Sequence, residues 1–222
     1  AIRFAESSLA AVEELDDYTA TLTKRELVNG QLLTQVMNLK FREEPFSVYL
    51  QYGEPHSGRE ILYVHGYNQN QILAHEGAGL SSLVGTVNLD PDGQQAMAEN
   101  RHRITDLGLK RMLELVIEQW TVESQYGEIE VRYYPDARLG NIHCQVIETA
   151  HPHPRRQFLY QTTRVYFDVE TQLPIRIENF GFPQNSAQQP PLVEEYTYLN
   201  VQTNVGLADQ DFDQRNPAYQ FR

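Results

Sequence analysis

Cysteine and long apolar runs are scarce in this sequence, and both shortages narrow the classes of protein to which it can belong. The 222 residues include a single cysteine, Cys144. One cysteine excludes an intramolecular disulfide and a cysteine-rich metal site. No apolar stretch approaches the ~20 residues that a membrane-spanning helix needs. We therefore expect neither a disulfide scaffold nor a membrane-spanning protein.

Basic residues are outnumbered by acidic ones. Lysine and arginine total 18 against 30 aspartates and glutamates, which gives a formal net charge of −12 and a pI near 5.0. Nucleic acids and anionic membrane surfaces are bound through clustered lysines and arginines. The charge balance therefore argues against both as the main partner. Residues 1–17 also lack the basic-then-apolar order of a signal peptide, so they indicate no compartment.

Motifs for the common catalytic and metal chemistries are missing as well. No serine lies in a Gly-x-Ser-x-Gly elbow, and no glycine-rich phosphate loop follows a strand. His151 and His153 share a face without a third ligand nearby, and Cys144 falls on an apolar face without a neighbouring base. Asp90 and Asp92 lack the ligand series of a calcium loop, so we interpret them as a turn. The sequence predicts no enzyme activity, no metal and no cofactor.

A packed core is nevertheless expected. Apolar residues make up 41% of the chain and aromatic residues 10%, which is typical of globular proteins. No linker rich in proline, glycine or serine divides the chain, and its composition does not shift along its length. We therefore predict a single domain over residues 1–222.

The most regular segment is an amphipathic stretch over residues 104–120. Its apolar residues recur at the three-and-four spacing of one helical face, with polar residues between them and Thr105 or Asp106 as the expected N-cap. The stripe consists of Leu109, Met112, Leu113, Val116, Ile117 and Trp120. Burying six such side chains contributes on the order of 10 kcal/mol, so the stripe must find a large apolar partner.

Period-two segments lie on both sides of that helix. Residues 5–15 predict a first helix, and from Tyr18 the apolar period changes to two. Asn29-Gly30 is a tight-turn signal, and residues 18–76 read as about five sequential antiparallel strands. The same alternation resumes over residues 128–201. One antiparallel sheet curled round the helix would bury the stripe.

Two segments have no clear period. Residues 77–103 form a long loop with a helical turn near 92–100, and two interpretations stay open: a movable lid over a site, or a loosely packed crossover. Glycines between Gly77 and Gly93 would let such a lid move. Residues 204–212 are expected to trail off in an extended conformation.

The order of these elements is similar to that of the outer-membrane lipoprotein carrier, or LolA-like, superfamily. The resemblance is carried by Arg42 before Pro45-Phe46, the segment GREILYVHGYN at 58–68, the helical insertion, and the hairpin from Phe167-Asp168 to Leu173-Pro174. Residues 18–75, with Leu89-Asp-Pro-Asp-Gly and Thr105-Asp-Leu-Gly-Leu, resemble a family of bacterial exported proteins that carries only a domain-of-unknown-function label. The resemblance implies an α+β fold with a single strongly curved antiparallel sheet, a half-open barrel wrapped around helices.

The resemblance also implies a function. Members of the superfamily act in the bacterial envelope, periplasmic or otherwise extracytoplasmic, and hold lipid or lipoprotein acyl chains in an apolar cavity. Two hypotheses follow: a non-enzymatic module that binds a lipid-like ligand, or an interaction or sensor module that docks an envelope protein on the same sheet. The candidate ligand-binding residues are Arg42, Met112, Val116, Ile117 and Trp120.

Arg42 enters through the resemblance alone. In the carrier, an arginine just before a proline helps to hold the inner helices closed, and Arg42 lies two residues further from Pro45 than that pattern has. Such an arginine would steer an anionic head group. The other interpretation is a solvated arginine at a strand end, paired with Glu43 or Glu44, which would contribute little to stability.

Overall fold

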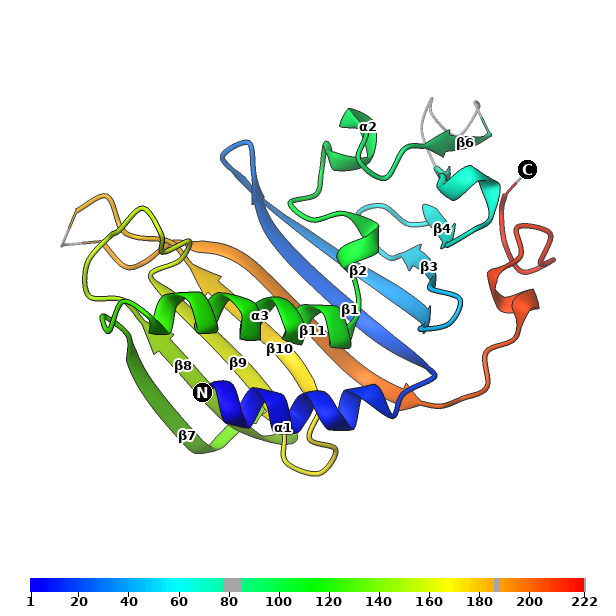
Figure 1. Cartoon of the computed structure of the whole chain (residues 1–222). Coiled ribbons are helices and arrows are strands. Elements are labelled where there is room, and N and C mark those ends of the chain that lie inside the picture. The colour runs from blue at the N-terminus through cyan, green and yellow to red at the C-terminus, as the bar shows by residue number, and fades with distance from the viewer. Residues whose placement is uncertain (78–84, 186–187, 222) are drawn as a thin grey trace. The chain divides into compact units, whose positions relative to one another are not determined.

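The computed structural model describes residues 1–77, 85–185 and 188–221 (Figure 1). Its α-helices are α1 (Ile2–Glu13), α2 (Gln94–Met97) and α3 (Leu109–Ser124), and its short 3-10 turns are η1 (Asn68–Asn70), η3 (Ile104–Asp106) and η4 (Asp209–Phe212). The strands are β1 (Asp17–Val28), β2 (Gln31–Arg42), β3 (Ser47–Tyr52), β4 (Glu60–Val64), β5 (Ile72–His75), β6 (Thr86–Leu89), β7 (Glu130–Leu139), β8 (Ile142–Ala150), β9 (Thr162–Asp168), β10 (Pro174–Phe180) and β11 (Leu192–Thr203).

The strands belong to one sheet, which is open rather than closed into a barrel. Their order is β6-β5-β4-β3-β2-β1-β11-β10-β9-β8-β7, so β6 and β7 form the two edges. Neighbours such as β2 and β3, β8 and β9, and β10 and β11 pair antiparallel. Most connections are therefore local hairpins, as the period-two segments predict. The expected α+β class with a single antiparallel sheet is confirmed.

The chain divides into two compact units. Unit 1 comprises residues 1–14, 25–27 and 108–197, and unit 2 comprises residues 15–24, 28–107 and 198–222. Strands β1 and β11 contribute residues to both units. Each unit is described by itself below, and the single domain expected from the sequence stays a prediction.

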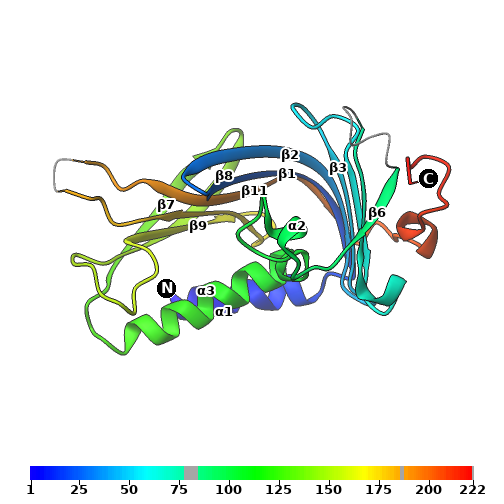
Figure 2. The same cartoon turned by 90° about the horizontal axis from the view of Figure 1, so that it is seen from above.

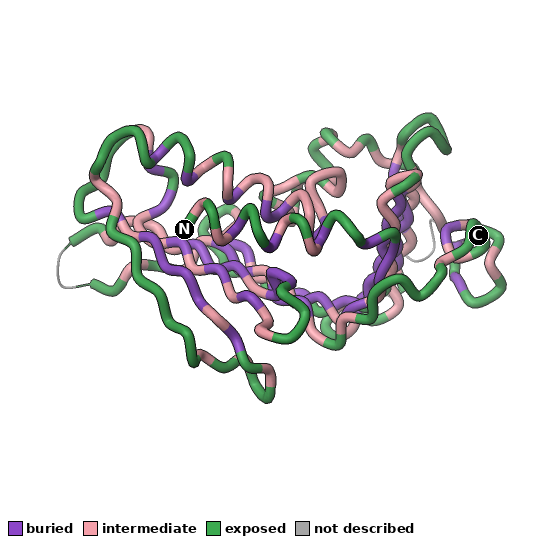
Figure 3. Tube along the Cα trace, turned by 60° about the horizontal axis from the view of Figure 1, so that its bottom comes forward, coloured by how far each residue is buried: buried purple, intermediate pink, exposed green. Residues whose placement is uncertain are grey.

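Unit 1 is a layer of strands with α1 and α3 lying along one of its faces (Figures 1 and 2). Buried and less buried residues alternate along β9, as expected for a strand covered on one side. Figure 3 colours the whole trace by burial. The ring of Phe4 on α1 meets that of Phe167 on β9 at 4.9 Å. The hydroxyl of Ser8 donates to the carbonyl of Gln172 at 2.5 Å, and this bond fixes the helix on the sheet.

The predicted central helix exists, but its start is corrected. The segment Ile104–Asp106 is a separate 3-10 turn, and α3 begins at Leu109 after Gly108. Gly108 has φ 124, a conformation that favours glycine, and it breaks the continuity that the apolar spacing implied. The expected N-cap at Thr105 or Asp106 is therefore wrong. The buried apolar stripe consists of Leu109, Met112, Leu113, Val116 and Trp120.

Unit 2 contains the first meander. Five strands lie between residues 17 and 75, as predicted, and Tyr18 stacks on Phe41 at 4.8 Å in its core. The segment 77–103, expected to be a loop, also contains β6, which pairs with β5. The four residues of β6 have no clear apolar alternation, and they form a strand because the edge of β5 would otherwise be unpaired. The helical turn is present as α2, while residues 78–84, part of the expected lid, lie outside the described residues.

The C-terminal segment of unit 2 corrects another expectation. Residues after 204 do not trail off: Phe212, Tyr219 and Phe221 pack against Tyr49 of β3 and Leu62 of β4. The rings of Tyr49 and Tyr219 stack at 4.0 Å. The Asp17 carboxylate accepts backbone N–H bonds from residues 205–207, and this anchors the start of the segment. The periodicity of the sequence could not predict this packing, because most of the segment has no regular secondary structure.

Candidate functional site

The candidate residues of the central helix lie in the layer between the helices and the strands of unit 1. We call this the helix-facing layer; its members include Phe4, Met112, Val116, Trp120, Val131, Tyr133, Val165, Phe167 and Ile177. Met112, Val116 and Trp120 are exposed by only 9%, 2% and 1%. Ile117 is half-buried on the flank of α3. The structure thus gathers the four candidates on one helix and buries three of them.

The helix-facing layer is open to solvent at the edge strand β7. Tyr133 turns toward the helices, since its ring lies 6.2 Å from that of Phe4, and Val131 shares its face of the strand. Both side chains are 51% exposed. Tyr134 points to the opposite face, where its hydroxyl donates to Glu148 at 3.2 Å. An apolar surface therefore continues from the buried layer out to the sheet edge.

Trp120 carries a polar group into this layer without a partner. Its indole Nε1–H is buried and has no hydrogen-bond acceptor in the part of the chain that the structure describes. A buried donor that stays unpaired costs free energy, about 1–3 kcal/mol. Such a group in a native fold calls for an explanation, and an incoming oxygen atom from a ligand or water supplies one.

A buried hydrogen-bond network crosses strands β9, β10 and β11 in unit 1. Thr163 donates to the Asn179 side chain at 2.7 Å, and Asn179 donates to a carboxylate oxygen of Glu194 at 2.8 Å. Tyr160 donates to the same oxygen at 2.7 Å. All four are at most 9% exposed. Sequence reasoning missed this network, although Thr163 and Asn179 fall in period two with apolar inward residues.

A buried contact between a histidine and a carboxylate lies at the end of α3. His151 Nε2 lies 3.1 Å from Glu123 Oε2, and both side chains are almost fully buried. The other ring nitrogen of His151 is 3.0 Å from the carbonyl oxygen of Glu128, and its ring stacks on Phe158 at 3.7 Å. No group of three metal-ligating side chains occurs among the described residues. The pair fixes the loop after β8 to α3.

Arg42 lies in unit 2 with its own set of partners. Its guanidinium contacts Asp209 at 2.8 Å and donates to the Ser47 hydroxyl at 3.2 Å. The same group lies 4.7 Å above the ring of Phe212. Arg42 thereby helps to hold the C-terminal segment on the sheet. Its part in ligand binding stays a prediction.

The sheet face of unit 1 that points away from the helices is charged. Arginine and glutamate alternate across the strands as Arg25, Glu195, Arg176, Glu178, Arg164, Glu148 and Arg132, with N–O distances from 2.5 to 3.8 Å. Burial and the neighbouring Glu178 carboxylate raise the pKa of the Tyr166 hydroxyl to about 12. A row of ion pairs offers no surface to an apolar ligand, so the helix-facing layer is the candidate site.

Cys144 is part of the core, as the sequence predicts. Its side chain is fully buried. Burial raises the pKa of the thiol, which keeps it protonated and unreactive at neutral pH.

Within the described residues, α3 and the other helices are too short or too polar to cross a membrane.

Two solved structures of other proteins share the fold at low sequence identity, and a third is similar with a TM-score below 0.5. The lipoprotein LppX of Mycobacterium tuberculosis is 12% identical with a TM-score of 0.52, over 96% of this chain and 97% of that one. An uncharacterized conserved protein from Thermus thermophilus is 7% identical with a TM-score of 0.51, over 94% and 91%. A domain of an outer membrane lipoprotein-sorting protein from Vibrio parahaemolyticus is 15% identical with a TM-score of 0.43, over 96% of each chain.

Sequence comparison gives the family. No curated protein matches the sequence. A family model, protein of unknown function DUF1571, matches residues 15–221, a range that includes all eleven strands and α3. The chain therefore belongs to the DUF1571 family, and the resemblance to a family that carries only a domain-of-unknown-function label is confirmed.

Proposed function

We propose that this protein is a non-catalytic envelope carrier that holds a lipid-like ligand, such as an acyl chain, in the helix-facing layer of unit 1. The observation that carries the proposal is the continuity of this layer. It runs from the buried stripe of α3 to Val131 and Tyr133, which are half-exposed at the sheet edge. A ligand that enters at β7 would bury apolar surface both at the sheet edge and against the stripe of α3.

Entry requires the helices to move from the strands, and the ends of α3 suit such a motion. Gly108 precedes the helix with φ 124 and Gly127 follows it with φ 65. Positive φ is accessible to glycine at little cost, so the chain can change direction at both glycines, although motion at the end of α3 must also break the Glu123–His151 contact. The N-terminal helix α1 packs on α3 and would move with it.

The energy of burial is sufficient for useful affinity. Each methylene removed from water contributes about 0.8 kcal/mol, so a dozen carbons gross roughly 10 kcal/mol before ordering costs. Micromolar binding needs about 8 kcal/mol. The unpaired indole N–H of Trp120 would donate to a carbonyl oxygen of the ligand and contribute orientation. Met112, Val116 and Ile117 would line the chain.

The test is titration with a fluorescent fatty acid. Wild type is compared with two variants. Met112→Trp fills the helix-facing layer, and Val122→Trp adds the same ring at a position on α3 where the side chain is 49% exposed. We expect saturable binding in wild type and Val122→Trp, and at least tenfold weaker binding in Met112→Trp. Thermal melting of each variant separates lost affinity from lost folding.

A second pair of variants tests the entrance without disturbing the core. Tyr133→Ser removes an exposed ring on the helix side of β7, and Tyr134→Ser removes its neighbour on the charged side. Weaker binding is expected for Tyr133→Ser alone. No saturable signal in wild type, or equal affinity in all variants, contradicts the carrier function.

A second function is favoured by one observation on the same strand. β7 is a sheet edge, and its register with β8 is regular over residues 130–134 and irregular between Tyr134 and Ala137, beside Pro135. An extended segment of an envelope protein could add a strand beside residues 130–134. A photo-crosslinker placed at Val131 would then capture one defined partner in cells, whereas the same group at Val122 would not. Capture at both positions or at neither contradicts docking at this edge.

A further inference from the structure

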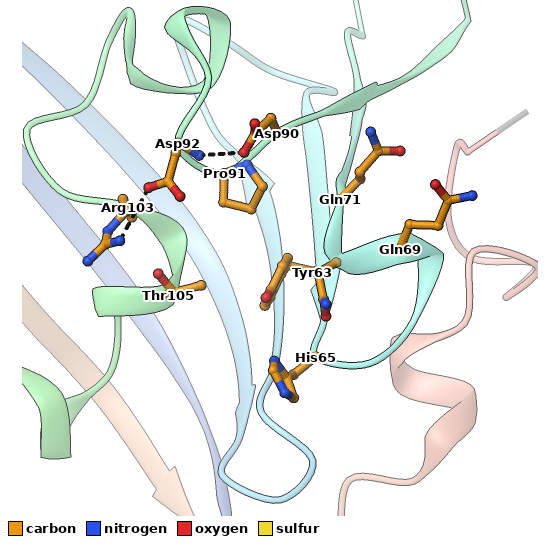
Figure 4. Close-up of a pocket in the computed structure, with 10 residues that line it drawn as sticks. Tyr63, His65, Gln69, Gln71, Asp90, Pro91, Asp92, Arg103 and Thr105 are labelled. Atoms are coloured by element: carbon orange, nitrogen blue, oxygen red, sulfur yellow. Dashed lines mark hydrogen bonds and ion pairs between the residues drawn. The ribbon is translucent and has the colours of Figure 1, made fainter.

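Unit 2 contains an open pocket of about 590 Å³ that belongs to neither the helix-facing layer nor the charged face (Figure 4). That volume lies in the range of small-molecule sites. Four segments supply its walls: the end of β4, the η1 turn, the residues after β6, and the residues around η3. The lining residues are Tyr63, His65, Gln69, Asn70, Gln71, Asp90, Pro91, Asp92, Arg103 and Thr105.

Polar groups dominate the lining, and carboxylates outnumber the one guanidinium. The two carboxylates are Asp90 and Asp92, and the one guanidinium is Arg103. Arg103 contacts Asp92 at 3.2 Å and Asp106 at 3.2 Å. An anionic ligand would therefore face two carboxylates and a cation that is already engaged. An acyl chain would leave these polar groups without water, which costs free energy.

Hydrogen-bonding capacity remains on several of these side chains. Asp90 accepts the backbone N–H of Asp92 with one oxygen, which leaves its other oxygen able to accept from a ligand. The side-chain amides of Gln69 and Gln71 have no partner among the residues that the structure describes. An amide both donates and accepts, whereas a carboxylate only accepts. The pocket thus presents donors and acceptors side by side.

The η1 turn holds its residues in an unusual backbone conformation. Asn68, Gln69 and Asn70 all have positive φ, at 47, 55 and 59. Asparagine tolerates this region, but a glutamine there is disfavoured. The conformation is maintained by bonds from the Gly66 N–H to Asn70 and from Asn68 to Asn88, at 2.7 Å each. Strained turns that are held by surrounding bonds concentrate at ligand sites, and this one directs two amides to the pocket.

We propose that this pocket binds a neutral, polyhydroxylated ligand of the saccharide class. Each hydroxyl of a sugar donates and accepts, which matches interleaved amides and carboxylates. The apolar face of a pyranose ring would pack on Pro91. The carboxylates of Asp90 and Asp92 would accept hydrogen bonds from hydroxyls of the sugar.

The experiment is NMR titration of the isotope-labelled full chain with three neutral sugars at millimolar concentrations: glucose, N-acetylglucosamine and trehalose. Inorganic phosphate serves as an anionic probe. Gln71→Ala removes one free amide at an extended position, and Asp90→Asn removes a charge while keeping an oxygen for the Asp92 N–H. The control is Gln31→Ala, an exposed glutamine on β2 of the same unit.

We expect saturable shifts for at least one sugar at residues that line the pocket. Gln71→Ala should weaken that binding about three- to tenfold, as for one lost hydrogen bond, and Asp90→Asn at least as much. Gln31→Ala should bind like wild type. The proposal is overturned by the absence of saturable shifts with all three sugars, by shifts away from the pocket, by tighter binding of phosphate, or by unchanged affinity in both pocket variants.

Discussion

Leu113 illustrates how a single residue of α3 determines the stability of unit 1. Its side chain is fully buried at the centre of the stripe. Leu113→Asp would place an unpaired charge there, and a loss of more than about 3 kcal/mol in the free energy of unfolding is expected. The measurement is urea denaturation. Val122→Asp, on the exposed side of the same helix, should lose less than about 1 kcal/mol, and equal losses would mean that α3 does not pack as described.

Gly77 is a residue whose side chain is excluded by another backbone. A Cβ on Gly77 would lie 2.4 Å from the Cα of Gly58, closer than carbon atoms approach. Gly77→Ala must push the two segments apart, at a cost of about 1–3 kcal/mol. At Gly53 the nearest atom to such a Cβ is 3.5 Å away, so Gly53→Ala should cost under about 0.5 kcal/mol. Chemical denaturation of both variants checks the difference, and equal costs would contradict the close approach.

At the scale of elements, the C-terminal segment of unit 2 depends on charge. Although burial raises it, the pKa of Asp211 is lowered below 3.8 by the hydrogen bond from Lys40 and by the Ala208 N–H. Lys40 lies 2.7 Å from Asp211. A carboxyl whose pKa is lower in the folded protein stabilises it above the unfolded pKa, and this contribution is lost as the pH falls through the folded value.

The expected result is loss of protection in residues 204–221 as the pH falls below 3.8, measured by hydrogen exchange. Lys40→Met removes the partner and should make protection of this segment lower at neutral pH and less dependent on acid. Tyr219 and Phe221 would still pack in that variant, so the chain should remain folded. An unchanged pH profile in Lys40→Met would show that the ion pair does not hold the segment.

An element could be predicted from the sequence where neighbouring residues determine it, and could not where a contact with a distant segment determines it. α3 and the strands of 17–75 follow from apolar spacing, and the sequence carried that signal in Met112, Val116 and Trp120. The break at Gly108 depends on one φ value, and β6 depends on an edge that β5 offers. The pocket unites segments between residues 63 and 105, and spacing alone does not bring Gln71 and Asp90 together.

At the scale of the whole molecule, the two units share strands. β1 and β11 each contribute residues to both units. Hydrogen-bonded strands of this kind transmit unfolding, so we expect one cooperative thermal transition, with calorimetric and van't Hoff enthalpies equal. Differential scanning calorimetry measures both. Two resolved transitions would contradict the prediction of a single domain and would mean that the units unfold independently.

The carrier function depends on what occupies the helix-facing layer in the cell. The most direct measurement is native mass spectrometry of the full chain purified from its own host without detergent. The account predicts a population heavier than the bare chain by the mass of a lipid, and this population should be reduced in Met112→Trp but not in Val122→Trp. A wild-type spectrum with the bare chain alone, in protein that also fails to take up added fatty acid, would contradict it.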